Sequence, residues 1–189
     1  MGKFYEEGFD PNDLSIRVSE LLVATADGSD ELIDSAVTDM LALLRERTQM
    51  DVVFVSEFVD GKQVFHYVDA SQEQHVMKVG DSELLERTWC QRVVDGRLPE
   101  MVANVPQFPG KDELPKPSFD IGTYLSTPIL LDDGHVYGTL CCLSFSPLES
   151  VHERDLRNLK SVAQLVAKKI DKSHLHDKGA PVTFTLVPK

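Results

Sequence analysis

Two pairs of short apolar strands, each joined by a tight turn, constrain the fold of this 189-residue chain most strongly. Residues 52–59 are β-branched and aromatic, Asp60-Gly61 forms a two-residue turn signal, and a second strand is expected over 62–68. The stretches 121–131 and 135–145 repeat this arrangement around Asp-Asp-Gly. Strands that are joined by such short turns pair antiparallel, so the sequence predicts an antiparallel sheet.

Helical patterns lie on both sides of these strands. The clearest is 30–48, where apolar residues recur every three or four positions, and 14–24 and 151–172 show similar stripes. Additional short strands are expected in 74–80 and 100–105. The sequence therefore predicts an α+β fold, with a central antiparallel sheet of five to six strands and the terminal helices on one face.

The other face of this sheet also needs a cover. The candidates are a predicted helix over 82–95 and a loop of about 15 residues that contains four prolines, at 106–120. Loops of this length in a compact domain often act as lids over binding sites. A sheet covered by a short helix and a loop would enclose a pocket, so we expect a ligand site on this face.

The charge of the chain excludes several classes of partner. With 31 acidic and 19 basic residues, the formal net charge is −12, which disfavours binding to nucleic acid or to anionic membranes. There is no apolar run of about 20 residues, and the acidic N-terminal stretch lacks a secretory signal. Three cysteines fit a reducing compartment, so we expect a cytoplasmic location.

Cys141 and Cys142 are adjacent in the middle of a predicted strand. Adjacent strand residues point to opposite faces, so the two thiols cannot share a metal ion or a pocket without a bulge. We expect Cys142 to share the pocket face with Gly138 and Ser144, and Cys141 to face the helices together with Tyr137, Thr139 and Leu143. Packing is the ordinary role of a buried free cysteine, and it stays open for both residues.

Three segments together resemble a GAF domain. They are TWCQRVVDGRLPEMVANV at 88–105, FDIGTYLSTPILLDDGHVYGTLCCLSFSP at 119–147, and HERDLRNLKSVAQLVAKKI at 152–170. The pattern is similar to a bacterial branch in which GAF domains accompany diguanylate cyclase, phosphodiesterase or histidine kinase modules. The resemblance implies a GAF domain over 14–172, an N-terminal arm over 1–13, and a tail over 173–189 that contains a strand-like run.

The departures from better-known GAF types leave the ligand and any cofactor unnamed. The spaced signature of the cyclic-nucleotide-binding type is absent, and no cysteine is followed by the histidine that the bilin-binding type requires. Gly122 stands where the phytochrome pattern has a proline. Free methionine sulfoxide reductases are similar in fold, but their cysteines lie in pocket-side loops within motifs that this sequence does not match.

Eight residues are candidates for ligand binding. Tyr124 and Ser126 share one face of a strand, Asp120 lies where the lid joins that strand, and the others lie on the predicted helix or on strands. The full set is Tyr67, Trp89, Cys90, Val93, Asp120, Tyr124, Ser126 and Cys142. Ordinary buried hydroxyls bonded to backbone, and a cysteine that only packs, are the alternatives. We expect no metal site, because even His174 and His176 lie in a tail without a matching ligand set.

Three functions remain open from the sequence. The first is a non-catalytic sensory domain, which binds a small molecule and relays its state through a homodimeric helix bundle to a downstream signalling protein or output domain. The second is a redox enzyme of the free methionine sulfoxide reductase type that uses Cys90 and Cys142. The third is a ligand-free dimerisation module. The sequence does not decide whether the chain is a stand-alone regulator or part of a longer protein.

Overall fold

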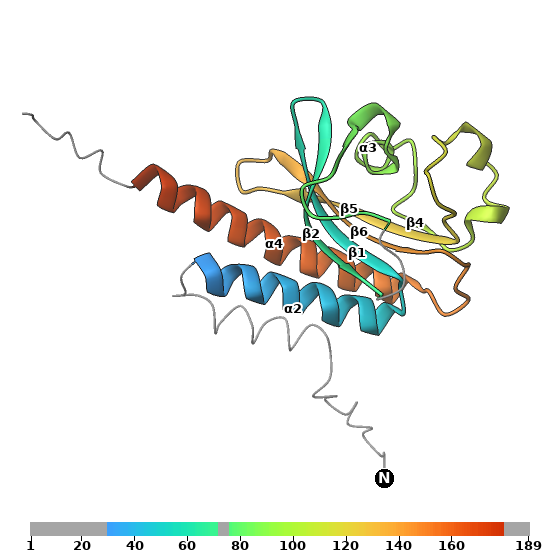
Figure 1. Cartoon of the computed structure of the whole chain (residues 1–189), viewed down its shortest axis with the longest axis horizontal. Coiled ribbons are helices and arrows are strands. Elements are labelled where there is room, and N and C mark those ends of the chain that lie inside the picture. Colours follow the sequence, from blue (N-terminus) through green and yellow to red (C-terminus); the bar gives the residue numbers. More distant parts are fainter. Residues whose placement is uncertain (1–29, 72–75, 180–189) are drawn as a thin grey trace, which may run out of the picture.

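The computed structural model describes residues 30–71 and 76–179, and its centre is a six-stranded antiparallel sheet (Figure 1). The strand order across the sheet is β3-β2-β1-β6-β5-β4. The strands are β1 (Val52–Val59), β2 (Lys62–Ala70), β3 (Ser82–Leu84), β4 (Met101–Val102), β5 (Thr123–Leu130) and β6 (Val136–Ser144). The two predicted hairpins are confirmed as β1–β2 and β5–β6.

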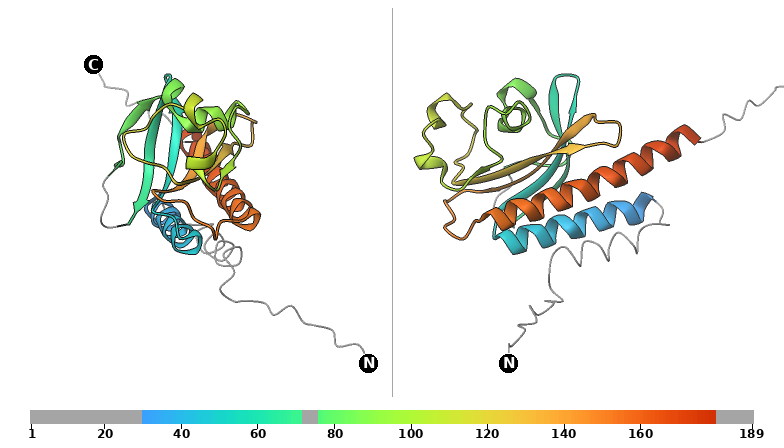
Figure 2. Two further views of the ribbon diagram at one scale, coloured as in Figure 1. Left: turned by 90° about the vertical axis from the view of Figure 1, so that its right-hand side faces the viewer. Right: turned by 180° about the vertical axis from the view of Figure 1, so that it is seen from behind.

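Helices cover the two faces of the sheet unequally. The helices are α2 (Asp30–Thr48), α3 (Trp89–Val94) and α4 (Glu153–Gly179), with 3-10 turns η1 (Leu85–Arg87), η2 (Val105–Gln107) and η3 (Lys111–Glu113). The long helices α2 and α4 lie side by side on one face, where α2 packs mainly under β1 and β2, and α4 mainly under β5 (Figure 2). The short α3 and the segment between β4 and β5 lie on the other face. The α+β prediction is therefore confirmed.

The first hairpin closes through a turn that the sequence specifies locally. Asp60 and Gly61 both have positive φ angles, 50° and 72°, as the tight two-residue hairpin turn requires. Glycine reaches this backbone conformation without steric cost, and aspartate tolerates it better than most residues. The turn therefore fixes where β1 ends and β2 begins, as predicted.

The sheet separates two apolar clusters. The helix-side cluster joins the sheet to α2 and α4, and includes Leu44, Val53, Leu125, Cys142 and Leu159. The pocket-side cluster joins the sheet to α3, and includes Phe54, Trp89, Cys90, Tyr124 and Cys141. Successive residues of one strand thus enter different clusters, as the alternation of side chains along a strand requires.

The predicted faces of Cys141 and Cys142 are wrong. Cys142 packs in the helix-side cluster and Cys141 in the pocket-side cluster. The pairing shifts by one residue between Ile129 and Leu130, so that Tyr137 is the extra residue on β6. A β-bulge of this kind transfers every following side chain to the opposite face.

A second bulge moves Tyr67 in the same way. The β1–β2 pairing shifts between Val55 and Ser56, and His66 becomes the extra residue on β2. Tyr67 therefore stands opposite Val55 and packs against the helix-side cluster instead of the predicted pocket. In both hairpins the turn agrees with the sequence prediction, and the bulge beyond the turn has no counterpart in it.

The predicted helix over 82–95 is correct only at its C-terminal half. Ser82–Leu84 forms the edge strand β3 on β2, and α3 begins only at Trp89, after the N-cap Thr88. The third strand is thus later than the predicted 74–80, of which 74 and 75 lie outside the described residues. The predicted helix at 14–24 and the strand-like run of the tail also lie outside them, as do the side chains of His174 and His176.

Candidate functional site

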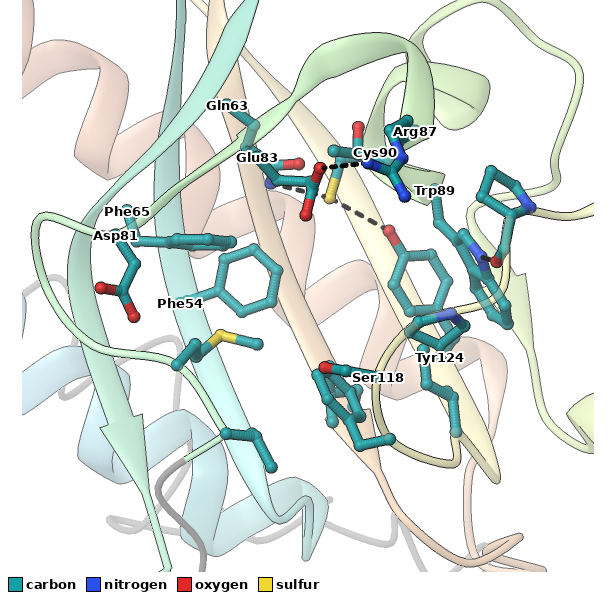
Figure 3. A pocket seen from close by; sticks show the side chains of 18 of the residues that line it. Phe54, Gln63, Phe65, Asp81, Glu83, Arg87, Trp89, Cys90, Ser118 and Tyr124 are labelled. Atoms are coloured by element: carbon teal, nitrogen blue, oxygen red, sulfur yellow. Dashed lines mark hydrogen bonds and ion pairs between the residues drawn. The ribbon is translucent and has the colours of Figure 1, made fainter.

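A cavity of about 790 Å³ lies on the pocket face of the sheet (Figure 3). Its floor is formed by side chains from four strands, namely Phe54, Phe65, Tyr124 and Leu143. Phe54 and Phe65 meet edge to face, with ring centroids 5.1 Å apart and an interplanar angle of 82°. The floor is therefore broad, aromatic and held by packing between neighbouring strands.

The walls are α3 and the proline-rich loop, as the sequence predicted. Residues 115–119 and Ile121 line the cavity from the loop, and Trp89 lines it from α3. The indole Nε1 of Trp89 donates a hydrogen bond of 2.8 Å to the carbonyl oxygen of Pro115. Trp89 also packs edge to face on Tyr124, with centroids 5.3 Å apart. One side chain thus connects helix, loop and floor.

Charged residues of both signs stand at the cavity. Asp81, Glu83, Arg87 and Lys116 all contribute to its lining. The Arg87 Nη1 and Glu83 Oε1 atoms are 3.9 Å apart, and both side chains are more than half exposed. A pair this exposed contributes little to stability, so these side chains are free to engage the polar end of a ligand.

A group of polar side chains, which we call the thiol cluster, lies at the inner end of the cavity. It consists of Gln63, Cys90, Tyr124, Ser126 and Cys141, all buried. The Cys90 sulfur lies 3.1 Å from the Cys141 sulfur, 3.2 Å from the Tyr124 hydroxyl oxygen, and 3.1 Å from the Gln63 Nε2 that donates to it. The Ser126 hydroxyl lies 2.9 Å from the Cys141 sulfur.

This network makes the two thiols chemically unequal. Burial by itself raises the pKa of Cys90, but hydrogen bonds from Cys141, Thr139, Tyr124 and Gln63 outweigh it and lower that pKa to about 6. Burial raises the pKa of Cys141 well above its ordinary value, and the neighbouring Cys90 raises it further. Within this pair, the hydrogen bonds therefore favour the thiolate on Cys90 over the thiolate on Cys141.

The structure brings three of the eight candidate residues to the cavity wall. They are Trp89, Cys90 and Tyr124. Ser126 is fully buried and bonds Cys141, so it lies behind the wall. Val93 packs in the pocket-side cluster without lining the cavity. Asp120 is exposed and does not line it either.

The remaining two candidates, Tyr67 and Cys142, lie on the helix side of the sheet. In the hypothesis of a redox enzyme that uses Cys90 and Cys142, the second cysteine is misplaced, because Cys142 lies across the sheet from Cys90 and the thiol beside Cys90 is Cys141. Sequence analysis also missed Gln63, which is 2% exposed and donates to both Cys90 and Ser56. A glutamine placed one residue after the start of a strand gives no signal of such burial.

Comparison with known proteins identifies the family. The GAF domain family model matches residues 33–170. This chain is a member of the GAF domain family. The match lies within the span of 14–172 predicted for the domain, whose exact limits stay a prediction.

Relatives of this GAF domain include a signalling enzyme. The chain is 30% identical over 163 residues to the diguanylate cyclase DgcP of Escherichia coli (strain K12). The match covers 84% of this chain and 45% of that enzyme, so the chain spans less than half the length of this relative.

Solved structures share the fold at low identity. The phycocyanobilin-bound GAF domain of a cyanobacterial phytochrome has a TM-score of 0.68 at 13% identity, with 87% of this chain and 97% of that one covered. The GAF domain of an Acinetobacter phosphoenolpyruvate-protein phosphotransferase gives 0.66 at 13%, with 86% and 94% covered. The free methionine-R-sulfoxide reductase of Neisseria meningitidis, solved with its substrate, gives 0.64 at 18%, with 86% and 91% covered.

Two kinds of feature have no counterpart in the described residues. Within 30–71 and 76–179, no helix has both the length and the apolar character needed to span a bilayer. Across the same part of the chain, no group of three or more His, Cys, Asp or Glu side chains is arranged to hold a metal ion.

Proposed function

We propose that this GAF domain is a regulatory module that binds a small molecule in the cavity between the sheet and α3. The observation that carries the proposal is the cavity itself, with its volume of about 790 Å³. Ligand pockets of drug-sized molecules commonly have this size and combine apolar walls with a few polar groups.

The lining favours a ligand with two unlike ends. The aromatic side chains of Phe54, Phe65 and Trp89 suit an apolar or planar body, which would stack or pack on them. The side chains of Glu83, Arg87 and Lys116 suit a polar group that carries a donor or a negative charge. Gln63 is held by Ser56 and Cys90, and is less available.

A single strand of the sheet connects the cavity to the helices, so a movement caused by a ligand could reach them. Tyr124 lines the cavity, whereas its neighbour Leu125 packs in the helix-side cluster with α4. A shift of β5 under the cavity would therefore displace residues that contact α4. We propose that ligand binding biases the packing of α2 and α4 between two arrangements.

A second copy of the chain is the proposed partner of this helical layer. Leu43 on α2, and Leu156, Leu165 and Ile170 on α4, are only partly buried within one copy. Pairing of two helical layers would cover such side chains and give a helix bundle. The similarity to a diguanylate cyclase supports a signalling protein or domain as the recipient of the output.

Native mass spectrometry of the purified protein tests ligand binding and dimer formation together. We expect a dimer whose mass exceeds that of two denatured chains by a bound small molecule. The Ser118→Phe variant adds a ring to a residue of the lining loop, so the excess mass should disappear. Ser150→Phe, at an exposed position away from the cavity, is the matched control.

Trp89 provides an independent readout, because it is the only tryptophan in the chain and lines the cavity. Compounds that enter the cavity should change its fluorescence in the wild type and in Ser150→Phe, but not in Ser118→Phe. A monomer without bound molecule and without any fluorescence response would contradict the proposal. Reduction of free methionine sulfoxide, lost in Cys90→Ser, would instead favour an enzyme.

A further inference from the structure

We propose that Cys90 and Cys141 form a reversible disulfide when a peroxide enters the cavity, so that this site also senses oxidation. The two sulfur atoms lie 3.1 Å apart, and both thiols are free. A disulfide bond is about 2.05 Å long, so closure needs an approach of only about 1 Å. The residues are 51 positions apart in sequence, and the fold alone brings them together.

The two thiols differ in access, and this difference assigns their roles. Cys90 lines the cavity, through which a small oxidant can reach it. Cys141 is 0% exposed, does not line the cavity, and lies on the central strand β6 with its sulfur 3.1 Å from that of Cys90. Figure 3 shows the Cys90 sulfur between Gln63 and the Tyr124 hydroxyl. Cys90 is therefore the thiol that a peroxide meets first, and Cys141 is placed to resolve the product.

The hydrogen bonds around the pair support the same order. Gln63 Nε2 donates to the Cys90 sulfur, and the Tyr124 hydroxyl lies within hydrogen-bond distance of it. Donors of this kind stabilise a thiolate, which is the reactive form, and the pKa of Cys90 is lowered accordingly. The thiol of Cys141 keeps its proton until Cys90 has reacted.

The reaction then proceeds in two balanced steps. The Cys90 thiolate attacks one oxygen of hydrogen peroxide, the O–O bond breaks, and the departing hydroxide takes up a proton as water. This leaves a sulfenic acid on Cys90. The Cys141 sulfur attacks the Cys90 sulfur, the S–O bond breaks as the S–S bond forms, and hydroxide leaves with the Cys141 proton as a second water.

The bond would tether α3 to the centre of the sheet. Cys90 follows Trp89 directly, so a fixed Cys90 also constrains the residue that contacts the lining loop at Pro115. Oxidation would therefore alter the wall of the cavity. This role goes beyond ligand binding, and it does not require any ligand to be present.

The test treats the reduced full chain with hydrogen peroxide, without added ligand, and measures its denatured mass. We expect the chain to lose the mass of two hydrogen atoms and peptide mapping to find a single disulfide bond, between Cys90 and Cys141. Trp89 fluorescence should change, and dithiothreitol should reverse all of these effects. Cys142→Ser is the matched control and should behave as the wild type, because Cys142 lies across the sheet. In denaturant, the same treatment should give mixed pairings.

Two variants separate the steps. Cys141→Ser should stop at a Cys90 sulfenic acid that dimedone traps, and Cys90→Ser should form no link. If either variant fails to fold, the peptide map of the native wild type still shows whether Cys90 and Cys141 form the disulfide bond. Four results with the native protein would overturn the proposal. They are an unchanged mass, a disulfide bond that involves Cys142, a disulfide bond between two chains, and oxidation of Cys90 without a bond to Cys141.

Discussion

The indole Nε1 of Trp89 and the carbonyl oxygen of Pro115 are 2.8 Å apart, and their hydrogen bond joins α3 to the loop that closes the cavity. Trp89→Phe keeps an aromatic ring on Tyr124 but removes the donor. A hydrogen bond of this kind contributes about 0.5–1.5 kcal/mol, so the backbone amides of the non-proline residues within 114–119 should exchange about 2- to 10-fold faster. Hydrogen–deuterium exchange with mass spectrometry measures this.

The neighbouring turn η2 provides an internal control for that experiment. Its N-cap Asn104 accepts from the backbone N–H of Gln107, so the hydrogen bonding of this turn is local and does not use the Trp89 donor. Exchange over 104–108 should therefore stay unchanged in Trp89→Phe. Equal acceleration in both segments would mean that the substitution loosens the whole face, and would contradict a specific role for the Trp89–Pro115 bond.

The ionisation of Cys90 gives a prediction with a defined pH dependence. Its pKa is lowered to about 6, so the thiolate should be scarce below that pH and should form as the pH rises through it. Cys141 and Cys142 have raised pKa values and stay protonated over this range. Thiolate absorbance at 240 nm should therefore rise by one cysteine equivalent with a midpoint near pH 6 in the reduced protein.

Two glutamine variants test the cause of that shift. Gln63→Leu removes a donor to Cys90 and should move the midpoint to higher pH. Gln91→Leu changes a glutamine of α3 that bonds Asp95 near the surface, and should leave the midpoint where it is. A wild-type midpoint at or above that of an ordinary cysteine, about 8.5, would show that the hydrogen bonds do not outweigh the effect of burial.

The sequence contained enough to predict the architecture but not the faces of two strands. Turn residues and apolar periods act locally, and the hairpins β1–β2 and β5–β6 follow from them. The bulges at His66 and Tyr137 have no such local signal, and each reverses the face of every residue that follows. For this reason the predicted pocket positions of Tyr67 and Cys142 are wrong, whereas Tyr124, on β5, lines the cavity as predicted.

The site was predictable to a similar degree. The long helices cover one face of the sheet, so only the short helix and the proline-rich loop remain to cover the other face. The location of the cavity follows from this, and Trp89 and Cys90 lie on that short helix. The thiol cluster does not follow, because Gln63 and Cys141 reach Cys90 only through the register of three strands. Likewise, pairing of β3 with β2 overrides the helical pattern of 82–84.

The start of α3 depends on Thr88. Its hydroxyl oxygen accepts a hydrogen bond of 3.3 Å from the backbone N–H of Gln91, which satisfies a free donor of the first turn. Thr88→Ala should therefore cost about 1 kcal/mol of unfolding free energy. Thr88→Ser keeps the hydroxyl and should restore most of the loss. Urea denaturation measures both, and equal midpoints for the two variants would argue against the cap.

Gly138 is required for the close approach of β6 to β1. A Cβ atom at this position would lie 1.9 Å from the carbonyl oxygen of Ser56, and backbone cannot move aside as a flexible side chain can. Since the bulge at Tyr137 is the adjacent residue, the strand is already bent here. Gly138→Ala should therefore lower the unfolding free energy by about 1–3 kcal/mol, as overpacking of a core does.

Gly110→Ala is the control for this prediction. Its new Cβ would meet the movable Phe108 ring at 3.1 Å, so the loss of unfolding free energy should be much smaller. Urea unfolding followed by Trp89 fluorescence compares them, and similar midpoints would refute the steric argument.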